Sequence, residues 1–172
     1  LTRPANQEQG YKVNISGGSI QEQEVVACPK GTSISVKNLF FNLPARKNFL
    51  KSITVETKHI MEEFQRMALA YPRVVMHFYN QDKEVFKLPA TGLKERIASL
   101  LNTKEESLIS CSEETDIVRI NGYVGTPKSA KRTRGHQFLF ANGRYIRDNY
   151  LNHAVKNAYA ELIDEKMVAF YH

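Results

Sequence analysis

Residues 31–51 read GTSISVKNLFFNLPARKNFLK. In this stretch the expected structure changes from extended chain to helix. Polar and apolar residues alternate over 31–36, which predicts a β-strand. Asn42 is a residue type that caps helices, and Pro44 suits a first helical turn. The stretch therefore predicts a strand, a turn and a short helix that extends through Leu50.

A longer amphipathic helix is expected next, from about Thr54 to the helix-breaking Pro72. Apolar residues recur at helical spacing along one side, namely Ile60, Phe64, Met67, Ala68 and Tyr71. The opposite side carries charged residues, namely Glu56, Lys58, Glu62, Glu63 and Arg66. We therefore expect the first side to be buried and the second to face solvent.

The remaining sequence predicts strands in groups separated by helices. A hairpin over 11–27 turns at Gly17–Gly18. The elements expected later, in chain order, are strands over 73–80 and 84–88, a helix over 93–101, strands over 107–112 and 115–124, a hairpin over 137–146 that turns at Asn142–Gly143, a helix from its cap Asp148 to Leu162, and a strand from Met167. This grouping predicts an α+β fold.

Positive charge is concentrated in two windows of the chain. The 172 residues carry a net charge of +6. Residues 117–147 contain seven Lys or Arg and no acid, and residues 25–55 contain five Lys or Arg and no acid. Such segregation favours an anionic partner, most often nucleic acid. The alternative is a basic face that is simply solvated.

The sequence contains no self-contained active site. The five histidines form no H-x-x-x-H or H-E-x-x-H pair, and neither a G-x-S-x-G nor a G-x-x-x-x-G-K-[ST] motif occurs. Cys28 and Cys111 form no metal-ligand pattern and suit a reducing compartment. No apolar run is long enough to span a membrane, and no secretory signal is present. Because the chain starts without Met and stops in an apolar stretch, we expect it to be a piece of a longer protein.

The second basic window supplies a candidate DNA-binding surface. The loop over 125–135 leads directly into the hairpin whose turn is Asn142–Gly143. If loop and turn are neighbours, their cations form one surface that neutralises phosphates without reading the base sequence. The candidate residues are Lys128, Lys131, Arg132, Arg134, Arg144 and Arg147.

These candidates also have ordinary structural explanations. Arg144 can pair with Asp148, Arg147 can contact the cap of the following helix, and the loop cations can be solvated. Tyr145 lies between the two arginines and can stack on a base, although packing beneath the hairpin is the more common role.

Two blocks of the sequence resemble one family. Residues 31–51 resemble the G-T-x-[VI]-x-V-x-x-L-F-x-N-x-P-A-R-x-x-F-L signature of the MutL/Pms DNA mismatch repair proteins. Residues 138–148, FLFANGRYIRD, together with LNHAV at 151–155, resemble a second block of that family, V-N-G-R-x-[IM]-R-D-x-x-[IL]-x-x-A. The similarity covers residues 11–172.

The resemblance implies a GHKL-type ATPase domain followed by a domain of the ribosomal protein S5 domain 2-like fold. Residues 1–52 would be the C-terminal edge strands of the ATPase domain and the junction. Residues 53–172 would be the S5-like transducer domain, a mixed sheet with packed helices. Gly31 and Thr32 match the last nucleotide-site motif of the superfamily, so they would lie near the adenine side of an ATP pocket.

Family motifs that this sequence lacks limit the chemistry that the resemblance implies. The Mg-binding Glu-x-x-x-Asn helix, the Asp-x-Gly-x-Gly loop, the Gly-rich lid and the Asn-Val-His-Pro-x-Lys block do not occur here. We therefore expect no catalytic residue, no ATP hydrolysis and no cofactor in this chain, with ATP and Mg²⁺ acting in the parent protein.

The resemblance also implies partners and a location. Double-stranded DNA and the mismatch-recognition protein MutS are the expected partners, and the parent would be a homodimer without membrane association. Its location would be cytoplasmic or nucleoid-associated. The second block of the family supplies an arginine to a DNA groove, and Arg144 is the matching position.

The prediction is a DNA-binding, nucleotide-coupled module of a MutL-type protein, an ATP-dependent matchmaker between mismatch recognition and strand processing. Two alternatives stay open. An RNA-binding S5-like module would expose Phe138, Phe140 and Tyr145 for base stacking. The transducer domain of another GHKL ATPase, such as a type II topoisomerase subunit, would transmit hydrolysis rather than hold DNA.

Overall fold

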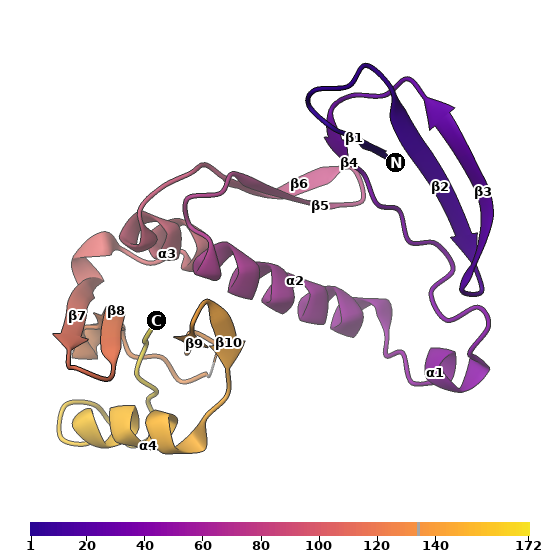
Figure 1. Cartoon of the computed structure of the whole chain (residues 1–172). Coiled ribbons are helices and arrows are strands. Elements are labelled where there is room, and N and C mark those ends of the chain that lie inside the picture. The colour runs from indigo at the N-terminus through magenta and orange to yellow at the C-terminus, as the bar shows by residue number, and fades with distance from the viewer. Residues whose placement is uncertain (134) are drawn as a thin grey trace. The chain divides into compact units, whose positions relative to one another are not determined.

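The computed structural model describes residues 1–133 and 135–172, and Figure 1 traces its elements. The chain divides into two compact units, Leu1–Glu56 and Thr57–His172. Their boundary falls in the first turn of helix α2 (Ile53–Ala70). The assignment of residues 1–52 to an ATPase domain and 53–172 to a transducer domain stays a prediction.

The first unit is built on a four-stranded sheet in the order β3-β2-β1-β4. Its strands are β1 (Thr2–Arg3), β2 (Gly10–Ser16), β3 (Ser19–Val26) and β4 (Gly31–Thr32). The β2–β3 hairpin turns at Gly17 and Gly18, whose φ angles of 60° and 85° suit glycine because it has no Cβ. The hairpin expected in this region is confirmed.

The strand expected over 31–36 is wrong beyond Thr32. β4 pairs only with the two residues of β1, in the register Thr2↔Thr32 and Arg3↔Gly31. Because β1 offers no further partner, the alternating residues that follow form no ladder. Ile34 is 84% exposed as a result.

The short helix α1 (Pro44–Asn48) is confirmed, although its cap differs from the expected one. Pro44 occupies the first turn, as predicted. The N-cap position is Leu43, and no side chain caps the helix, so the expected cap from Asn42 is wrong. Phe40, three residues before the N-cap Leu43, has a positive φ of 63°, so the backbone turns ahead of the helix.

The second unit combines helices with antiparallel hairpins. After α2, its elements are β5 (Met76–Asn80), β6 (Lys83–Leu88), α3 (Leu93–Leu101), the 3-10 turn η1 (Glu105–Ser107), β7 (Leu108–Glu114), β8 (Arg119–Gly125), the 3-10 turn η2 (Pro127–Ser129), β9 (Leu139–Ala141), β10 (Arg144–Ile146) and α4 (Asn149–Ala158). The hairpins are β5–β6, β7–β8 and β9–β10. These elements match the expected ones, although β5 starts at Met76 and α4 ends at Ala158.

The C-terminal segment joins two of these hairpins. It runs antiparallel to β8 at the bridge Val124↔Tyr171 and parallel to the chain before β9 at Gln137↔Tyr171. Figure 1 shows the C-terminus between β8 and β9. Backbone hydrogen bonds connect Tyr123 with His172 in both directions, at 2.7 and 2.8 Å. The last residues therefore form isolated bridges, antiparallel to β8 and parallel to the chain before β9, and not the continuous strand expected from Met167.

The hydrophobic core of the second unit lies where α2 and α3 meet the strands. Its buried residues come from α2, β6, α3, β7 and the two late segments, namely Ala68, Leu69, Leu88, Ile97, Leu100, Leu101, Leu108, Phe138 and Phe170. A smaller cluster of Tyr159, Ala169 and Tyr171 lies at the end of α4. Removal of these side chains from water is the main favourable contribution to folding.

One charged side chain, Arg96 of α3, is buried beside this core and is only 1% exposed. Its Nη2 donates to the carbonyl oxygens of Pro72, Val74 and Pro89, at 2.6, 2.7 and 2.9 Å. Burial lowers the pKa of Arg96 below its ordinary value. Arg96 therefore ties α3 to two other backbone segments, the stretch over 72–74 and Pro89 after β6.

The buried side of α2 differs from the predicted one. Ala68 and Leu69 are buried and Phe64 packs on the core, whereas Ile60 and Met67 are more than half exposed. The buried line includes Leu69 because this side chain packs in the same core cluster as residues of α3 and of the late segments. The polar side is not uniformly solvated either, since the Arg66 side chain is only 15% exposed.

Candidate nucleic-acid interface

The β9–β10 hairpin presents the arginine that the second sequence block indicates. Asn142 and Gly143 form its turn with φ angles of 50° and 75°, the pair of positive values that a two-residue Asn-Gly turn requires. Arg144 follows the turn opposite Ala141, and Tyr145 follows opposite Phe140. Because successive strand residues point to opposite faces, Arg144 is exposed while Tyr145 is half-buried.

Asp148 caps α4 and does not bind Arg144. Its Oδ1 accepts a hydrogen bond from the Leu151 backbone N–H at 2.8 Å, which confirms the predicted cap. Among the described residues, no carboxylate lies within ion-pair distance of Arg144 or Arg147. The ion pair that offered the structural alternative for Arg144 is therefore not formed.

Arg147 lies one residue beyond β10 and is exposed. Hydrogen bonding to Tyr145 raises the pKa of Arg147 above its ordinary value, and the negative charges of Glu62 and Glu63 add to this effect. Arg147 therefore remains a cation at any physiological pH.

The Tyr145 ring is occupied by protein contacts. The Arg66 guanidinium lies 4.3 Å from the ring centroid, and the rings of Phe138 and Phe140 meet Tyr145 edge-on at 6.3 and 5.9 Å. Phe138 is only 6% exposed. These rings therefore do not form the exposed stacking platform that an RNA-binding module would need, and Tyr145 packs as the more ordinary interpretation predicted.

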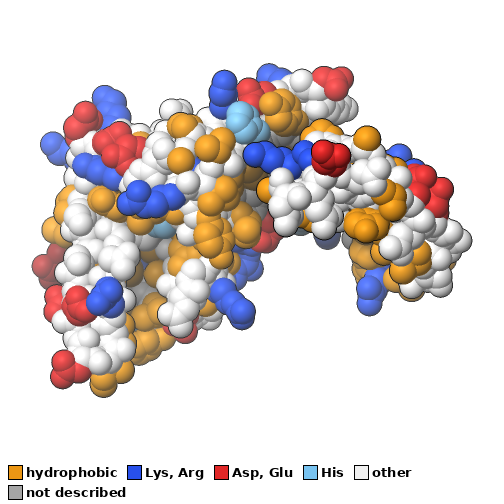
Figure 2. Space-filling model, turned by 45° about the horizontal axis from the view of Figure 1, so that its top comes forward, with side chains coloured by type: hydrophobic (Ala, Val, Ile, Leu, Met, Phe, Trp, Pro, Cys, Tyr) orange, Lys and Arg blue, Asp and Glu red, His pale blue; other side chains and the backbone are white. Residues whose placement is uncertain are grey.

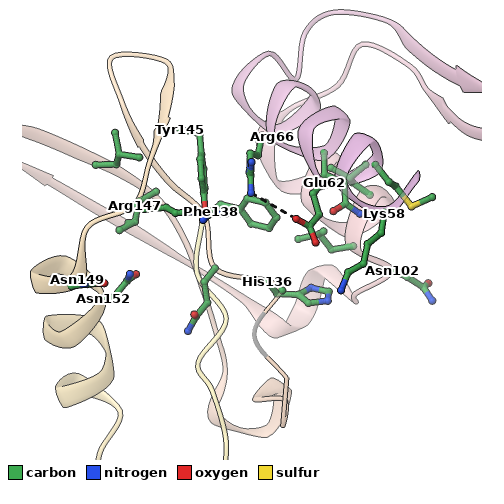
Figure 3. Close-up of a pocket in the computed structure, with 18 residues that line it drawn as sticks. Lys58, Glu62, Arg66, Asn102, His136, Phe138, Tyr145, Arg147, Asn149 and Asn152 are labelled. Carbon is green, nitrogen blue, oxygen red and sulfur yellow. Dashed lines mark ion pairs between the residues drawn. The ribbon is translucent and has the colours of Figure 1, made fainter. Parts of the chain in front are cut away.

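A cavity of about 750 Å³ opens between α2, the β9–β10 hairpin and the start of α4. Figure 3 shows its walls. Charged and polar side chains that line it include Lys58, Glu62, Arg66, Asn102, His136, Arg147, Asn149 and Asn152. Apolar side chains, such as Leu101, Phe138 and Ile146, complete the wall. Within the lining, Glu62 is the carboxylate, and it lies 3.9 Å from Arg66.

His136 is the lining residue whose polar atoms are least satisfied. Its Nδ1 is buried and has no hydrogen-bond partner among the described residues. Burial lowers the pKa of His136 below its ordinary value, and the charge of Lys131 lowers it further. The imidazole is therefore neutral near pH 7 and can donate one N–H to a ligand.

The basic loop contributes Gly135 to the lining of this cavity, whereas Lys128, Lys131 and Arg132 are exposed and lie outside the lining. Lys128 is part of η2, and Lys131 exchanges backbone hydrogen bonds with Val168 at 3.1 and 2.7 Å. Arg132 is exposed, and Arg134 lies outside the described residues. On the face shown in Figure 2, Lys and Arg side chains occur in several separate groups. A single surface shared by loop and hairpin stays a prediction.

Gly31 and Thr32 lie in the first unit, where both are exposed. Gly31 has a φ of 115° and open space where a side chain would be. The Thr32 hydroxyl lies 3.0 Å from the Thr2 hydroxyl. An open backbone face beside a hydroxyl suits one contact with a nucleotide, but one such hydrogen bond contributes only about 0.5–1.5 kcal/mol.

Two kinds of structural feature do not occur in the described residues. They contain no group of three or more His, Cys, Asp or Glu side chains placed to hold a metal ion. No helix among them has the length and hydrophobicity needed to cross a bilayer. Cys28 and Cys111 are both free thiols.

Sequence reasoning missed most of the cavity. Lys58, Glu62 and Arg66 were expected to face solvent, yet all three line it. Their spacing of four residues does place them on one helical side, which was the available signal. Nothing in the local sequence pairs that side with His136 or Asn149, because these contacts depend on how distant segments pack.

Comparison with known proteins relates this chain to one protein family. The family model for "DNA mismatch repair protein, C-terminal domain" matches residues 97–172. Similarity to curated mismatch repair proteins extends over nearly all of the chain, at 38–47% identity. The chain belongs to the MutL family of DNA mismatch repair proteins.

Two relatives illustrate the match. The MutL protein of Christiangramia forsetii is 46% identical over 171 residues, which is 99% of this chain and 28% of that protein. The MutL protein of Flavobacterium johnsoniae is 47% identical over 165 residues, which is 95% of this chain and 26% of that protein. The chain thus spans about a quarter of the length of the curated relatives it matches.

Solved structures show the same fold. The Aquifex aeolicus MutL ATPase domain complexed with ADP is 26% identical with a TM-score of 0.74, and the match covers 99% of this chain and 64% of that one. The crystal structure of the ATPase domain from the mismatch repair endonuclease Aquifex aeolicus MutL gives a TM-score of 0.77 at 23% identity. The predicted α+β fold of the GHKL and S5-like type is confirmed.

Proposed function

We propose that this chain forms part of the non-specific DNA-binding surface of a MutL-type mismatch repair protein. The observation that carries the proposal is the state of Arg144 and Arg147. Both are exposed on or beside one hairpin, and neither is neutralised by a carboxylate in the described part of the chain. An exposed guanidinium group without a carboxylate partner can bind two oxygens of one phosphate at the same time.

Lys128, Lys131, Arg132 and Arg134 extend the proposed surface. They are included on charge alone, because lysine and arginine in an acid-free loop neutralise phosphates and release counterions. If six cations contact phosphates, the slope of log K against log salt concentration is about −5.

Duplex DNA affinity measured across a salt series tests this proposal. Arg144→Gln is expected to weaken binding and to reduce the salt slope by about 1, because one phosphate contact is lost. Lys83→Gln, which removes an exposed charge at the tip of the β5–β6 hairpin, is the matched control and should leave the slope unchanged. If Arg144→Gln and Lys83→Gln give the same affinity and slope, Arg144 does not contact DNA.

We further propose that the module is coupled to nucleotide in the parent protein, where ATP with Mg²⁺ would supply the energy of a conformational switch. Thr32 fits one contact to that nucleotide. In the longer protein, Thr32→Val should weaken ATP binding by about 2- to 12-fold, the effect of one lost hydrogen bond. Thr2→Val breaks the same hydroxyl–hydroxyl contact but keeps the Thr32 hydroxyl, so it should leave ATP binding nearly unchanged. Equal effects of the two substitutions would assign Thr32 a purely structural role.

The remaining family properties are part of the same proposal. The parent would hydrolyse ATP, act as a homodimer with MutS and double-stranded DNA as partners, and work in the cytoplasm. The RNA-binding alternative is disfavoured by the burial of Phe138. The topoisomerase alternative is disfavoured because the similarity over nearly the whole chain is to mismatch repair proteins.

A further inference from the structure

We infer that the cavity between α2, the β9–β10 hairpin and the start of α4 binds a phosphate-bearing nucleotide unit, held by Lys58, Arg147 and His136. This unit can belong to a nucleic-acid strand or to a free nucleotide. The nucleic-acid source rests on the function proposed above, whereas the free nucleotide does not.

The size and chemistry of the cavity fit such a unit. Its volume of about 750 Å³ lies within the usual range of roughly 300–1,000 Å³ for small-molecule sites. Apolar side chains form part of the wall, and amide groups from Asn102 and Asn149 add neutral donors and acceptors, whereas the Asn152 amide oxygen accepts from the Tyr171 hydroxyl. This combination accommodates a planar base and a sugar as well as an anion.

The charge balance of the lining favours an anion. Arg66 is occupied, because it forms ion pairs with Glu62 and Glu63 and lies over Tyr145. Lys58 and Arg147 have no carboxylate within ion-pair distance in the described residues. The lining therefore carries three cations against one carboxylate, and Lys58 and Arg147 are the two cations that form no ion pair among the described residues.

His136 adds a group that lacks a partner. The His136 Nδ1 has no hydrogen-bond partner among the described residues, but it is sealed from solvent, so a ligand in the cavity can bond the ring only through Nε2. In Figure 3, Lys58 extends from α2 with its ammonium directed toward the His136 ring. The two side chains come from segments far apart in sequence and line the same cavity.

The start of α4 contributes a further favourable field. Asn149 and Asn152, in its first turns, line the cavity. The positive end of a helix dipole stabilises a nearby anion. Asp148 caps the Leu151 N–H, so this field is supplementary and the cationic side chains carry most of the expected affinity.

Thymidine monophosphate, a single-stranded thymidine oligonucleotide and a short duplex are the probes. They are titrated into the full chain while the His136 imidazole resonances are followed by NMR. Binding at the cavity is expected to shift those resonances with at least one probe. Lys58→Gln should weaken that binding by roughly tenfold or more, because a charged hydrogen bond is lost. Lys128→Gln, an exposed cation outside the lining, is the control and should have little effect.

The three probes distinguish the sources of the phosphate. A shift with thymidine monophosphate assigns the cavity to free nucleotides, and a shift with the oligonucleotide or the duplex but not with thymidine monophosphate assigns it to nucleic acid. If no probe moves the His136 resonances, or if Lys58→Gln binds as tightly as the unmodified chain, the inference is overturned.

The test also separates this inference from the proposed function. If duplex affinity depends on Arg144 but not on Lys58, the DNA surface stands and the cavity assignment fails. If thymidine monophosphate binding depends on Lys58 while Arg144→Gln leaves duplex affinity unchanged, the cavity stands and the DNA surface fails.

Discussion

The guanidinium of Arg66 lies over the ring of Tyr145, 4.3 Å from its centroid. This contact joins the middle of α2 to β10, the strand that precedes Arg147. Arg66 also forms ion pairs with Glu62 and Glu63 of its own helix. The position of the arginine-bearing hairpin therefore depends on a residue from a distant part of the sequence.

Loss of the contact between Arg66 and Tyr145 should destabilise the second unit. In a double-mutant cycle of Arg66→Met and Tyr145→Leu, the coupling free energy measured by urea unfolding is expected to be about 0.5–2 kcal/mol. Lys58→Met with Tyr145→Leu is the control cycle, since Lys58 lies on the same helix without a ring contact. A coupling energy for Arg66 no larger than that for Lys58 would contradict the prediction.

Asp148 should contribute to stability as a helix cap and not as a partner of Arg144. Asp148→Ala is expected to lower the free energy of unfolding by about 1 kcal/mol, and Asp148→Asn should retain most of it because the amide oxygen can still accept. Neither substitution should change duplex DNA affinity through Arg144. An affinity gain with Asp148→Ala would show that the aspartate restrains Arg144 after all.

Removal of the Arg96 guanidinium should be among the most destabilising single changes in the second unit. Arg96→Met removes the buried donor of the Val74 and Pro89 carbonyl oxygens, while Pro72 keeps the Thr91 N–H, so the expected loss is about 2–4 kcal/mol. Thermal and urea unfolding measure it, with the exposed Arg73→Met as control. A loss below about 1 kcal/mol would mean that these carbonyls find other partners at little cost.

Acid should destabilise the fold through His172. Burial lowers the pKa of His172 to about 4, against an ordinary value near 6.5. The unfolded chain therefore takes up a proton near pH 6.5, while the folded chain stays neutral until about pH 4. The associated stability is fully present above pH 6.5 and is lost as the pH falls to about 4, with an upper limit of about 3 kcal/mol.

Urea unfolding at a series of pH values measures this dependence. His172→Gln should flatten the curve between pH 6.5 and 4, and His153→Gln reports the same chemical change at an exposed position. If His172→Gln leaves the curve unchanged, the imidazole is accessible to protons in the folded chain.

Signals confined to a few neighbouring residues predicted structure well. Asn142–Gly143 indicated a tight hairpin turn, Asp148 indicated a cap, and Pro44 indicated the start of a short helix. Each of these features is set by the conformational preferences of the residues themselves or by hydrogen bonds within one helical turn. The exposed arginine at position 144 followed from the same local geometry.

Features that depend on a partner far along the chain needed the tertiary structure. The alternating residues at 31–36 form only a two-residue strand because β1 is short. Helix α2 buries Leu69 because that side chain packs with core residues of α3 and of the late segments. Local sequence patterns were sufficient to predict the family, the order of the elements and most of their turns. Only the fold decided that Lys58, His136 and Arg147 share one cavity, because packing alone brings together side chains that are widely separated in sequence.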